Sequence, residues 1–227
     1  MIDLHTHILP GIDDGAGTLN ESIKLLQMEI DSGVKTVALT PHYRPSADTL
    51  KDFLRKRKDS YKRLSAEVER RGLRIKLILG AEVAYSPDLL EMDIDEICYE
   101  GTKTILIELP PSHYPTLVKN VFYELLLRGY TPLIAHCERY PYFSKNTELL
   151  EELVYMGAIV QINAGPFARK WQNKRRLFSM INEELVHTIA TDTHSVDKRP
   201  PKLKTAMKVI EKKLGIEAVQ RLVSFEL

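Results

Sequence analysis

The feature that most constrains the fold of this 227-residue chain is an alternation of short apolar runs with amphipathic stretches. Each apolar run spans four to eight residues, as expected of a strand that is buried on both faces. The runs predict seven strands, at Ile2–His5, Thr36–Thr40, Ile75–Glu82, Thr104–Leu109, Thr131–His136, Ala158–Asn163 and Thr188–Asp192. Helical patterns separate most of them, at Leu19–Ser32, Ala47–Arg71, Leu117–Leu127, Glu148–Met156 and Lys170–Asn182.

Strands that alternate with helices form parallel βαβ units, which close into a barrel or remain an open, doubly wound sheet. No glycine-rich dinucleotide fingerprint follows any predicted strand, and this weakens the open-sheet alternative. Seven strands predict a small α/β barrel, one unit short of the usual TIM barrel. The acidic segment Pro87–Glu100 is expected to form only a brief or irregular helix. Because no linker divides the chain, we predict one domain over residues 1–227.

Composition excludes several classes of protein. Hydrophobic residues make up 44% of the chain and charged residues 28%, as in globular proteins with a substantial core. Lys and Arg number 32 against 31 Asp and Glu, so a net charge of +1 predicts no general attraction to nucleic acid or to an anionic membrane. The chain has two cysteines and no CxxC motif, so we expect no thiolate zinc site. Because it shows no signal peptide and no long apolar run, we expect a cytoplasmic protein.

Residues that bind metals follow the predicted strands. Six of the seven strands end in or just before such a residue, and five of the seven histidines in the chain belong to this set. In a parallel barrel all the carboxyl ends of the strands open on one face, so these side chains should meet there. The set comprises His5, His7, His42, Glu82, Glu108, His136, Asp192 and His194.

Coordination chemistry explains why this set indicates metal ions. Alternate residues of a strand point the same way, so His5 and His7 can bind one ion together, and Asp192 and His194 can do the same. Together with Asp14 there are nine potential ligands, which calls for two or three ions bridged by a carboxylate. Imidazole and carboxylate suit Mn, Fe or Zn. Each residue alone is as readily structural, but their joint position favours a metal cluster that activates water and neutralises a phosphoryl group.

Arginines near the ligands suggest a phosphate site. Arg139 follows His136 by three residues, and Arg199 follows His194 by five, so both should emerge on the metal face. Arg44 is a weaker third candidate. His113 is a candidate for the rim of the site. His187 begins its strand and is therefore expected to be structural.

Other phosphatase and hydrolase motifs are missing. A cysteine phosphatase needs an arginine six positions after its cysteine, but Thr104 and Phe143 occupy these positions after Cys98 and Cys137. The chain has neither a GxSxG elbow nor a phosphate-binding P-loop. The basic stretch Lys51–Lys76 contains 11 Lys or Arg against 4 Asp or Glu, which predicts a solvated helix face or, as an alternative, docking of an acidic partner.

The motifs resemble those of a known superfamily. The segment Asp3-Leu4-His5-Thr6-His7-Ile8-Leu9-Pro10-Gly11-Ile12-Asp13-Asp14-Gly15 resembles the opening motif of the PHP (polymerase and histidinol phosphatase) superfamily. It is most similar to that of the bacterial manganese-dependent protein-tyrosine phosphatases of capsule and exopolysaccharide operons. Later matches occur in order at Thr40-Pro41-His42, Gly80-Ala81-Glu82, His136-Cys137-Glu138-Arg139-Tyr140 and Thr191-Asp192-Thr193-His194.

The resemblance, which spans nearly the whole chain, implies a distorted (β/α)7 barrel that holds three metals, with manganese expected and iron or zinc as alternatives. It assigns His5, His7, Glu82 and Asp192 to the first ion, Glu82, Glu108 and His136 to the second, and Asp14, His42 and His194 to the third. It assigns Arg139 and Arg199 to the phosphate. One departure, Cys137 after His136, is expected to place a thiol near the metals.

The expected activity is hydrolysis of phosphotyrosine on protein, with a bacterial tyrosine kinase as candidate partner and no membrane insertion. Three alternatives stay open at this point. A small-molecule phosphatase such as a histidinol-phosphatase shares the superfamily, and a metal-dependent nuclease would use the basic stretch. The third is a regulatory domain that binds metals and a kinase without turnover.

Overall fold

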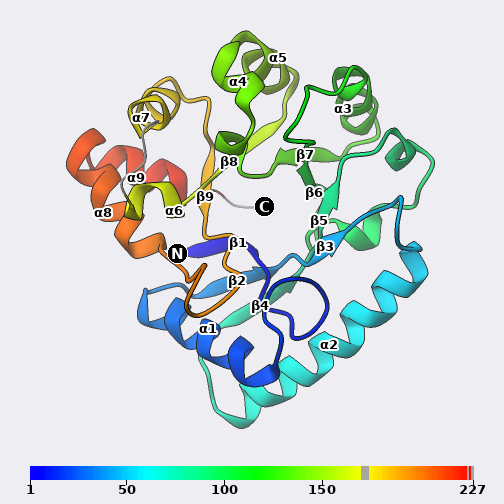
Figure 1. The fold of residues 1–227 in the computed structure, drawn as a ribbon, viewed down its shortest axis with the longest axis vertical. Helices are drawn as coiled ribbons and strands as arrows, with labels where there is room; N and C mark the ends of the chain where they lie inside the picture. The colour runs from blue at the N-terminus through cyan, green and yellow to red at the C-terminus, as the bar shows by residue number, and fades with distance from the viewer. Residues whose placement is uncertain (170–173, 224, 226–227) are drawn as a thin grey trace.

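The computed structural model describes residues 1–169, 174–223 and 225. Its strands surround a central axis and its helices lie outside them, as Figure 1 shows. Every described strand pair is parallel. The strands form two sheets, ordered β1-β2-β4 and β3-β5-β6-β7-β8-β9. Their bounds are β1 Ile2–Thr6, β2 Thr36–Leu39, β3 His42–Tyr43, β4 Lys76–Leu79, β5 Glu82–Ala84, β6 Thr104–Glu108, β7 Thr131–Ile134, β8 Ile159–Asn163 and β9 Thr188–Ala190.

Two of the predicted strands are each interrupted. The run Thr36–Thr40 stops at Leu39, and Pro41, which has no N–H to donate, separates β2 from the short β3. The run Ile75–Glu82 is divided into β4 and β5 at Gly80, where an added Cβ would lie 3.1 Å from the ring of Tyr99. The predicted continuous strands were therefore wrong in this detail.

The sheet curls until its last strand meets its first. The amide of Asp192, just beyond β9, donates to the carbonyl of His5 at 2.8 Å, and the amide of His7 donates to the carbonyl of Thr193 at 2.9 Å. If β2 with β3 and β4 with β5 count as one position each, seven strand positions surround the axis. The predicted distorted (β/α)7 barrel is confirmed. That residues 1–227 form a single domain stays a prediction.

A side-chain cap sets the start of helix α2. The predicted helix Ala47–Arg71 is α2, Leu50–Arg70, because the Thr49 side chain accepts from the amide of Asp52 and starts the helix there. The other expected helices are α1 Leu19–Asp31, α3 Val118–Leu127, α5 Glu148–Met156 and α7 Lys174–Asn182, while residues 170–173 of the predicted helix Lys170–Asn182 lie outside the described residues. The acidic segment Pro87–Glu100 forms two short 3-10 turns, η1 Pro87–Leu90 and η2 Asp95–Ile97, as expected.

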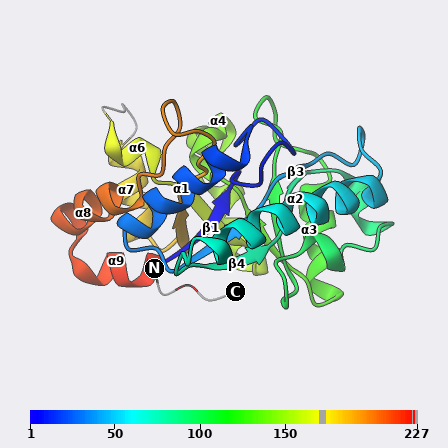
Figure 2. The ribbon, with the colours of Figure 1, turned by 90° about the horizontal axis from the view of Figure 1, so that it is seen from below.

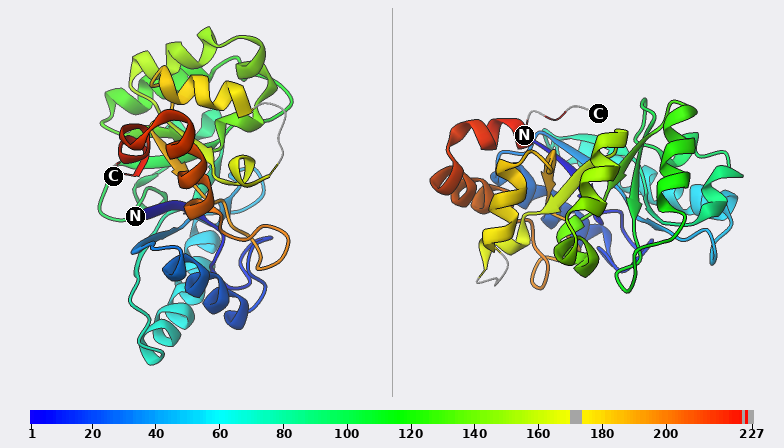
Figure 3. Two further views of the ribbon diagram at one scale, coloured as in Figure 1. Left: turned by 90° about the vertical axis from the view of Figure 1, so that its left-hand side faces the viewer. Right: turned by 90° about the horizontal axis from the view of Figure 1, so that it is seen from above.

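Several elements were not predicted. They are α4 Pro141–Lys145, α6 Gly165–Ala168, α8 Leu203–Leu214, α9 Ile216–Val223 and the 3-10 turn η3 Cys137–Arg139. Helices α8 and α9 lie together on one side of the barrel, away from α2 and α3 (Figure 3). The loops after β1 and after β9 rise from the same edge of the barrel, opposite the edge that carries the N-terminus (Figure 2). Both loops contribute residues to the candidate site.

Candidate metal centre

The nine predicted metal ligands lie together at one end of the barrel. They occupy the carboxyl ends of the strands and the loops that follow, where parallel barrels form their sites. Six of the nine are buried. The nine are His5, His7, Asp14, His42, Glu82, Glu108, His136, Asp192 and His194.

The buried carboxylate of Glu82 lies at the middle of this cluster. Its Oε2 is 3.2 Å from His5 Nε2, 3.2 Å from His7 Nε2 and 3.0 Å from His42 Nδ1, and its Oε1 is 2.8 Å from His136 Nε2. His42 reaches Glu82 because β3 and β5 pair in the register that sets these two residues side by side. Four imidazoles, from the end of β1, from β3 and from the turn after β7, therefore surround one carboxylate.

Electrostatics keeps this carboxylate charged. Burial by itself would raise the pKa of Glu82, but the nearby imidazoles of His5 and His136 hold it well below its usual value. Burial likewise opposes a charged His7, yet its contacts with Asp13 and Asp192 raise the pKa of this imidazole well above its usual value. Glu82 is therefore an anion at neutral pH, which is the state that binds a cation.

Asp192 links the cluster to two arginines. Its Oδ1 lies 3.4 Å from His7 Nε2 and 3.4 Å from His194 Nδ1. Its Oδ2 accepts hydrogen bonds from Arg139 and, at 2.6 Å, from Arg199. Although burial alone would raise the pKa of Asp192, the imidazoles of His5 and His7 and the guanidinium of Arg139 hold it well below its usual value.

Two ligand residues have an unusual backbone. His136 has φ of 28° and Asp192 has φ of 52°, and they are two of the three described non-glycine residues with positive φ. Such conformations cost about 1–3 kcal/mol each and persist only where the surroundings impose them. Both residues sit where a strand ends and the chain turns sharply, so the strain coincides with the position of a site side chain.

Asp14 brings the loop after β1 to the cluster. Its Oδ1 lies 3.4 Å from His42 Nε2 and 3.6 Å from His194 Nε2, although 66% of the Asp14 side chain is exposed. Glu108 approaches from β6, with its Oε1 3.5 Å from His136 Nε2. These two residues are the more accessible carboxylates of the nine.

The donor atoms fit metal ions. Three groups have ligand atoms within 4.8 Å of one another: His7, Asp14, His42 and His194; His5, His7 and Asp192; and His42, Glu82 and Glu108. Among the described residues, Asp192 Oδ1 and His194 Nε2 are buried and have no hydrogen-bond partner, as expected of atoms that face a cation. The groups overlap with the sets expected from the resemblance but differ from them. His42 lies beside Glu82 and Glu108, and His7 lies beside Asp14. His136, expected with Glu82 and Glu108, is in none of the three groups, although its Nε2 lies 2.8 Å from Glu82 Oε1.

Sequence reasoning missed Asp13, which orients a ligand. Its Oδ2 lies 2.7 Å from His7 Nδ1 and accepts the amide of His42 at 3.0 Å. Burial opposes its ionisation, but the contact with His7 lowers the pKa of Asp13 to about 2. Carboxylate–imidazole pairs of this kind fix the ring of a metal-binding histidine and raise its basicity. The adjacent pair Asp13-Asp14 in the sequence was the available signal.

Gln161 and Asn163 on β8 were missed as well. Gln161 Oε1 lies 3.1 Å from His5 Nδ1 and accepts the amide of His136 at 2.9 Å. Asn163 Nδ2 donates to Asp192 Oδ2 at 2.8 Å. β8 corresponds to the one predicted strand without a ligand residue, and two polar residues at alternate positions of an otherwise apolar run were the signal that this strand also faces the site.

The two predicted phosphate-binding arginines line a cavity of about 580 Å³ beside the cluster. Arg139 comes from η3 and Arg199 from the loop after β9. Both guanidinium groups are partly exposed, at 42% and 38% of the side chain. Two partly exposed guanidinium groups therefore lie in the cavity next to the metal cluster.

The remaining candidates lie elsewhere. Arg44 is exposed and does not line the cavity. His113 is exposed, with its Nδ1 2.9 Å from Ser112 Oγ, and belongs to none of the three ligand groups. His187 Nδ1 accepts the amide of Val160 at 3.1 Å, and burial lowers its pKa, which fits the structural role expected of it.

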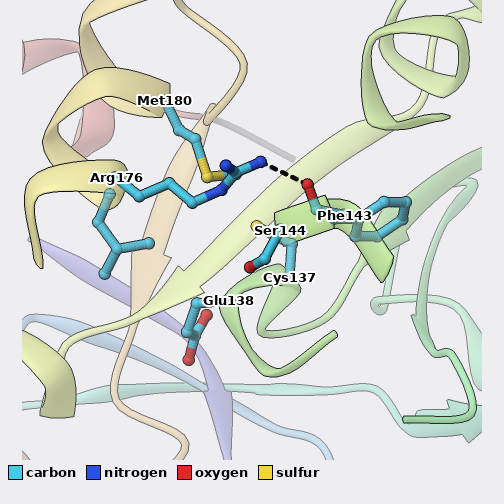
Figure 4. A pocket seen from close by; sticks show the side chains of 7 residues that line it. Cys137, Glu138, Phe143, Ser144, Arg176 and Met180 are labelled. Atoms are coloured by element: carbon cyan, nitrogen blue, oxygen red, sulfur yellow. Dashed lines mark hydrogen bonds between the residues drawn. The ribbon is translucent and has the colours of Figure 1, made fainter. Parts of the chain in front are cut away.

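Cys137 lies away from the metal cluster, contrary to the expectation. It lines a separate cavity of only about 10 Å³ with Arg176 and Met180 of α7, where Arg176 donates to the carbonyl of Phe143 (Figure 4). The positive φ of His136 starts a turn that directs the next side chain into the core. Burial also raises the pKa of Cys137 well above its usual value, so the thiol is neutral.

No helix in the described part of the chain is long and apolar enough to cross a membrane.

Comparison with known proteins gives a consistent family match. The sequence profile described as capsular polysaccharide synthesis, CpsB/CapC, matches residues 1–225. The tyrosine-protein phosphatase YwqE of Bacillus subtilis is 33% identical over 222 residues, which cover 96% of this chain and 86% of YwqE.

Solved structures agree with the sequence match. A crystal structure from work on YwqE of Bacillus subtilis and CpsB of Streptococcus pneumoniae, described as unique metal-dependent tyrosine phosphatases, has a TM-score of 0.90 and 31% identity, covering 99% of this chain and 92% of that one. Histidinol phosphate phosphatase of Lactococcus lactis has a TM-score of 0.56 at 14% identity, covering 93% and 94% of the two chains. The latter likeness indicates a shared fold.

Proposed function

Because this chain belongs to the CpsB/CapC family of capsular polysaccharide synthesis, we propose that it is a metal-dependent phosphatase that hydrolyses phosphotyrosine on protein. One observation supports the proposal most strongly: buried Glu82 is surrounded by four imidazoles, beside a cavity that holds two arginines. A cation site next to arginines that can bind phosphate is an arrangement that supports metal-dependent hydrolysis of phosphomonoesters.

The cluster would hold two or three ions. His5, His7 and Asp192 would bind one, and Asp14, His42 and His194 another, while Glu82 with Glu108 and His136 would complete the set. We propose manganese, which the resemblance implies, with iron and zinc as the alternatives that the same donors accept. When bound, such ions supply hydroxide near neutral pH and neutralise charge on the phosphoryl group.

The protein groups orient the substrate and stabilise charge. Arg139 and Arg199 each donate to Asp192 Oδ2, and both side chains reach the cavity, so a phosphoryl group entering there would accept N–H groups from both. Tyrosinate is a fair leaving group because the pKa of the phenol is ~10. We therefore assign no general acid.

The proposed partner is a phosphotyrosine protein of the capsule system, with a bacterial tyrosine kinase as the candidate. We propose the cytoplasm as the location, in keeping with two cysteines that are free and buried.

The test compares kcat/KM for a phosphotyrosyl peptide and for histidinol phosphate, using manganese-loaded protein. We expect a large preference for the peptide. A preference for histidinol phosphate would keep the metal chemistry but refute the tyrosine-phosphatase assignment. Loss of turnover on both substrates in a fully metal-loaded, folded sample would refute the phosphatase proposal itself.

A further inference from the structure

The cavity beside the metal cluster is larger and more basic than one phosphoryl group requires. Its volume of about 580 Å³ corresponds to roughly twenty water molecules at ~30 Å³ each. Five cationic side chains line it, against the two acidic residues Glu138 and Asp192. The five are Arg139, Arg169, Lys198, Arg199 and Lys202. Because the whole chain carries a net charge of only +1, this wall concentrates positive charge.

The five cations fall into two sets. Arg139 and Arg199 donate to Asp192, at the inner end of the cavity next to the metal cluster. Arg169, Lys198 and Lys202 are exposed, and their side chains have no ion pair or hydrogen bond with any described residue. These three residues, the outer cations, thus line one cavity without an acidic partner in the part of the chain that the structure describes.

The outer cations come from two separate segments. Arg169 follows α6, whereas Lys198 and Lys202 both lie in the loop between β9 and α8. The fold therefore brings Arg169 to the same wall as this loop, which its distance in the sequence does not reveal. Like charges that share a concave surface repel each other and raise the local potential, which attracts anions. A solvated helix face such as α2 differs, since there Arg55 and Lys56 have acidic neighbours.

We propose that Arg169, Lys198 and Lys202 form a second anion subsite, which binds a carboxylate or phosphate on the same polypeptide that carries the phosphotyrosine. The inference rests on the proposed function and specifies its substrate class: segments in which the target tyrosine has an acidic or phosphorylated neighbour. The inner arginines hold the phosphoryl group to be hydrolysed, and the outer cations hold the neighbouring anion.

The experiment uses three peptides that share one phosphotyrosine. In the first it is flanked by Gly and Ser, in the second by Glu, and in the third by another phosphotyrosine on one side. p-Nitrophenyl phosphate serves as a substrate without flanking groups. The test variant carries Arg169→Gln, Lys198→Gln and Lys202→Gln, and the matched control carries Lys51→Gln, Lys58→Gln and Lys62→Gln on the exposed face of α2.

We expect the wild type and the α2 control to hydrolyse the two anionic peptides with kcat/KM about tenfold above the neutral one, as two or three partly exposed ion pairs would give. The preference should fall as salt is raised. The test variant should lose it while keeping wild-type turnover of p-nitrophenyl phosphate, which also shows that it folds. Comparing the Glu peptide with the doubly phosphorylated one identifies which anion the subsite favours.

An unchanged preference in the test variant, or no preference in the wild type, would overturn the second subsite and leave the proposed function standing. Equal loss of preference in the α2 control would assign the effect to overall charge and also overturn it. No turnover of any phosphotyrosyl peptide would instead refute the proposed function, and the subsite with it.

Discussion

Two buried acidic clusters lie near β1, and they differ in their partners. The first is the metal cluster around Glu82 and Asp192. The second, the acid pair, consists of Asp3 and Glu29, both fully buried. Asp3 precedes His5 by two residues on the same strand, and its Oδ1 accepts the amide of Thr191 at 3.0 Å, next to Asp192.

Burial acts on both clusters in the same direction, yet the outcomes are opposite. In the metal cluster, imidazoles overcome burial and hold the pKa of Glu82 well below its usual value. In the acid pair, burial and the negative charge of Asp3 raise the pKa of Glu29 well above its usual value. The identity of the neighbours, and not depth, therefore decides which cluster is built for a cation and which keeps a proton.

The largest effect should follow from removing a ligand. His136→Ala removes the imidazole that lies 2.8 Å from Glu82 Oε1, and we expect kcat/KM for a phosphotyrosyl peptide to fall at least ~10²–10³-fold. The matched control is His113→Ala, which removes an exposed histidine that contacts Ser112 and not Glu82, and it should leave turnover near wild type. Near-wild-type activity in a pure His136→Ala sample would contradict the cluster assignment.

A smaller effect should come from residues that orient the ligands. Gln161→Leu removes the oxygen that lies 3.1 Å from His5 Nδ1, so we expect metal affinity to fall ~10–100-fold. The readout is the manganese concentration that gives half-maximal activity, together with kcat at saturating metal. Recovery of most of kcat at high manganese would fit a positioning role, whereas an unchanged metal requirement would contradict it.

The acid pair should respond to pH through stability. Glu29 has a folded pKa raised above its ordinary 4.5, so the folded state binds more protons than the unfolded state. Its contribution to the free energy of unfolding is fully present below pH ~4.5 and is lost as the pH rises through the folded pKa. Glu29→Gln should flatten this decline in urea titrations between pH 5 and 8.

Exposed Glu69→Gln on α2 is the control and should follow the wild-type pH profile. If the free energy of unfolding fell with pH as steeply in Glu29→Gln as in wild type, the acid pair would not retain a proton in the folded state. Because Glu29 is not a ligand, kcat/KM at neutral pH should change far less than in His136→Ala.

The smallest effect concerns the thiols. Burial raises the pKa of Cys98 to about 12 and that of Cys137 well above its usual range, so neither should form much thiolate at neutral pH. We expect a thiol-specific disulfide reagent to react slowly with the native protein and rapidly with two thiols per chain in denaturant. If Cys137 reacted rapidly and activity were lost at the same rate, the thiol would have to lie near the metal site, which would contradict its buried position.

Much of the site could be predicted because it depends on local rules. Alternation along β1 orients His5 and His7 together, and parallel topology brings the ends of distant strands to one face. The buried positions Leu203, Ala206, Met207 and Ile210 follow helical periodicity, so α8 could have been predicted from the same kind of pattern.

Other features depend on contacts between distant segments. The absence of a side chain at Gly80 leaves room for the ring of Tyr99, which is distant in the sequence. Likewise, Arg169 and Lys202 gain a shared role only when α6 and α8 pack side by side. The spacing of residues in the sequence does not predict such long-range contacts.

The most direct test of the central claim is a titration of metal-free protein with manganese. Bound manganese per chain and kcat/KM for a phosphotyrosyl peptide are measured on the same samples, in wild type and in Asp192→Ala. We predict no turnover without metal, activity that rises as two or three ions bind, and fewer bound ions with no recovery in the variant. Full turnover by the metal-free protein, or the same metal binding in both proteins, would contradict a catalytic metal cluster at Glu82 and Asp192.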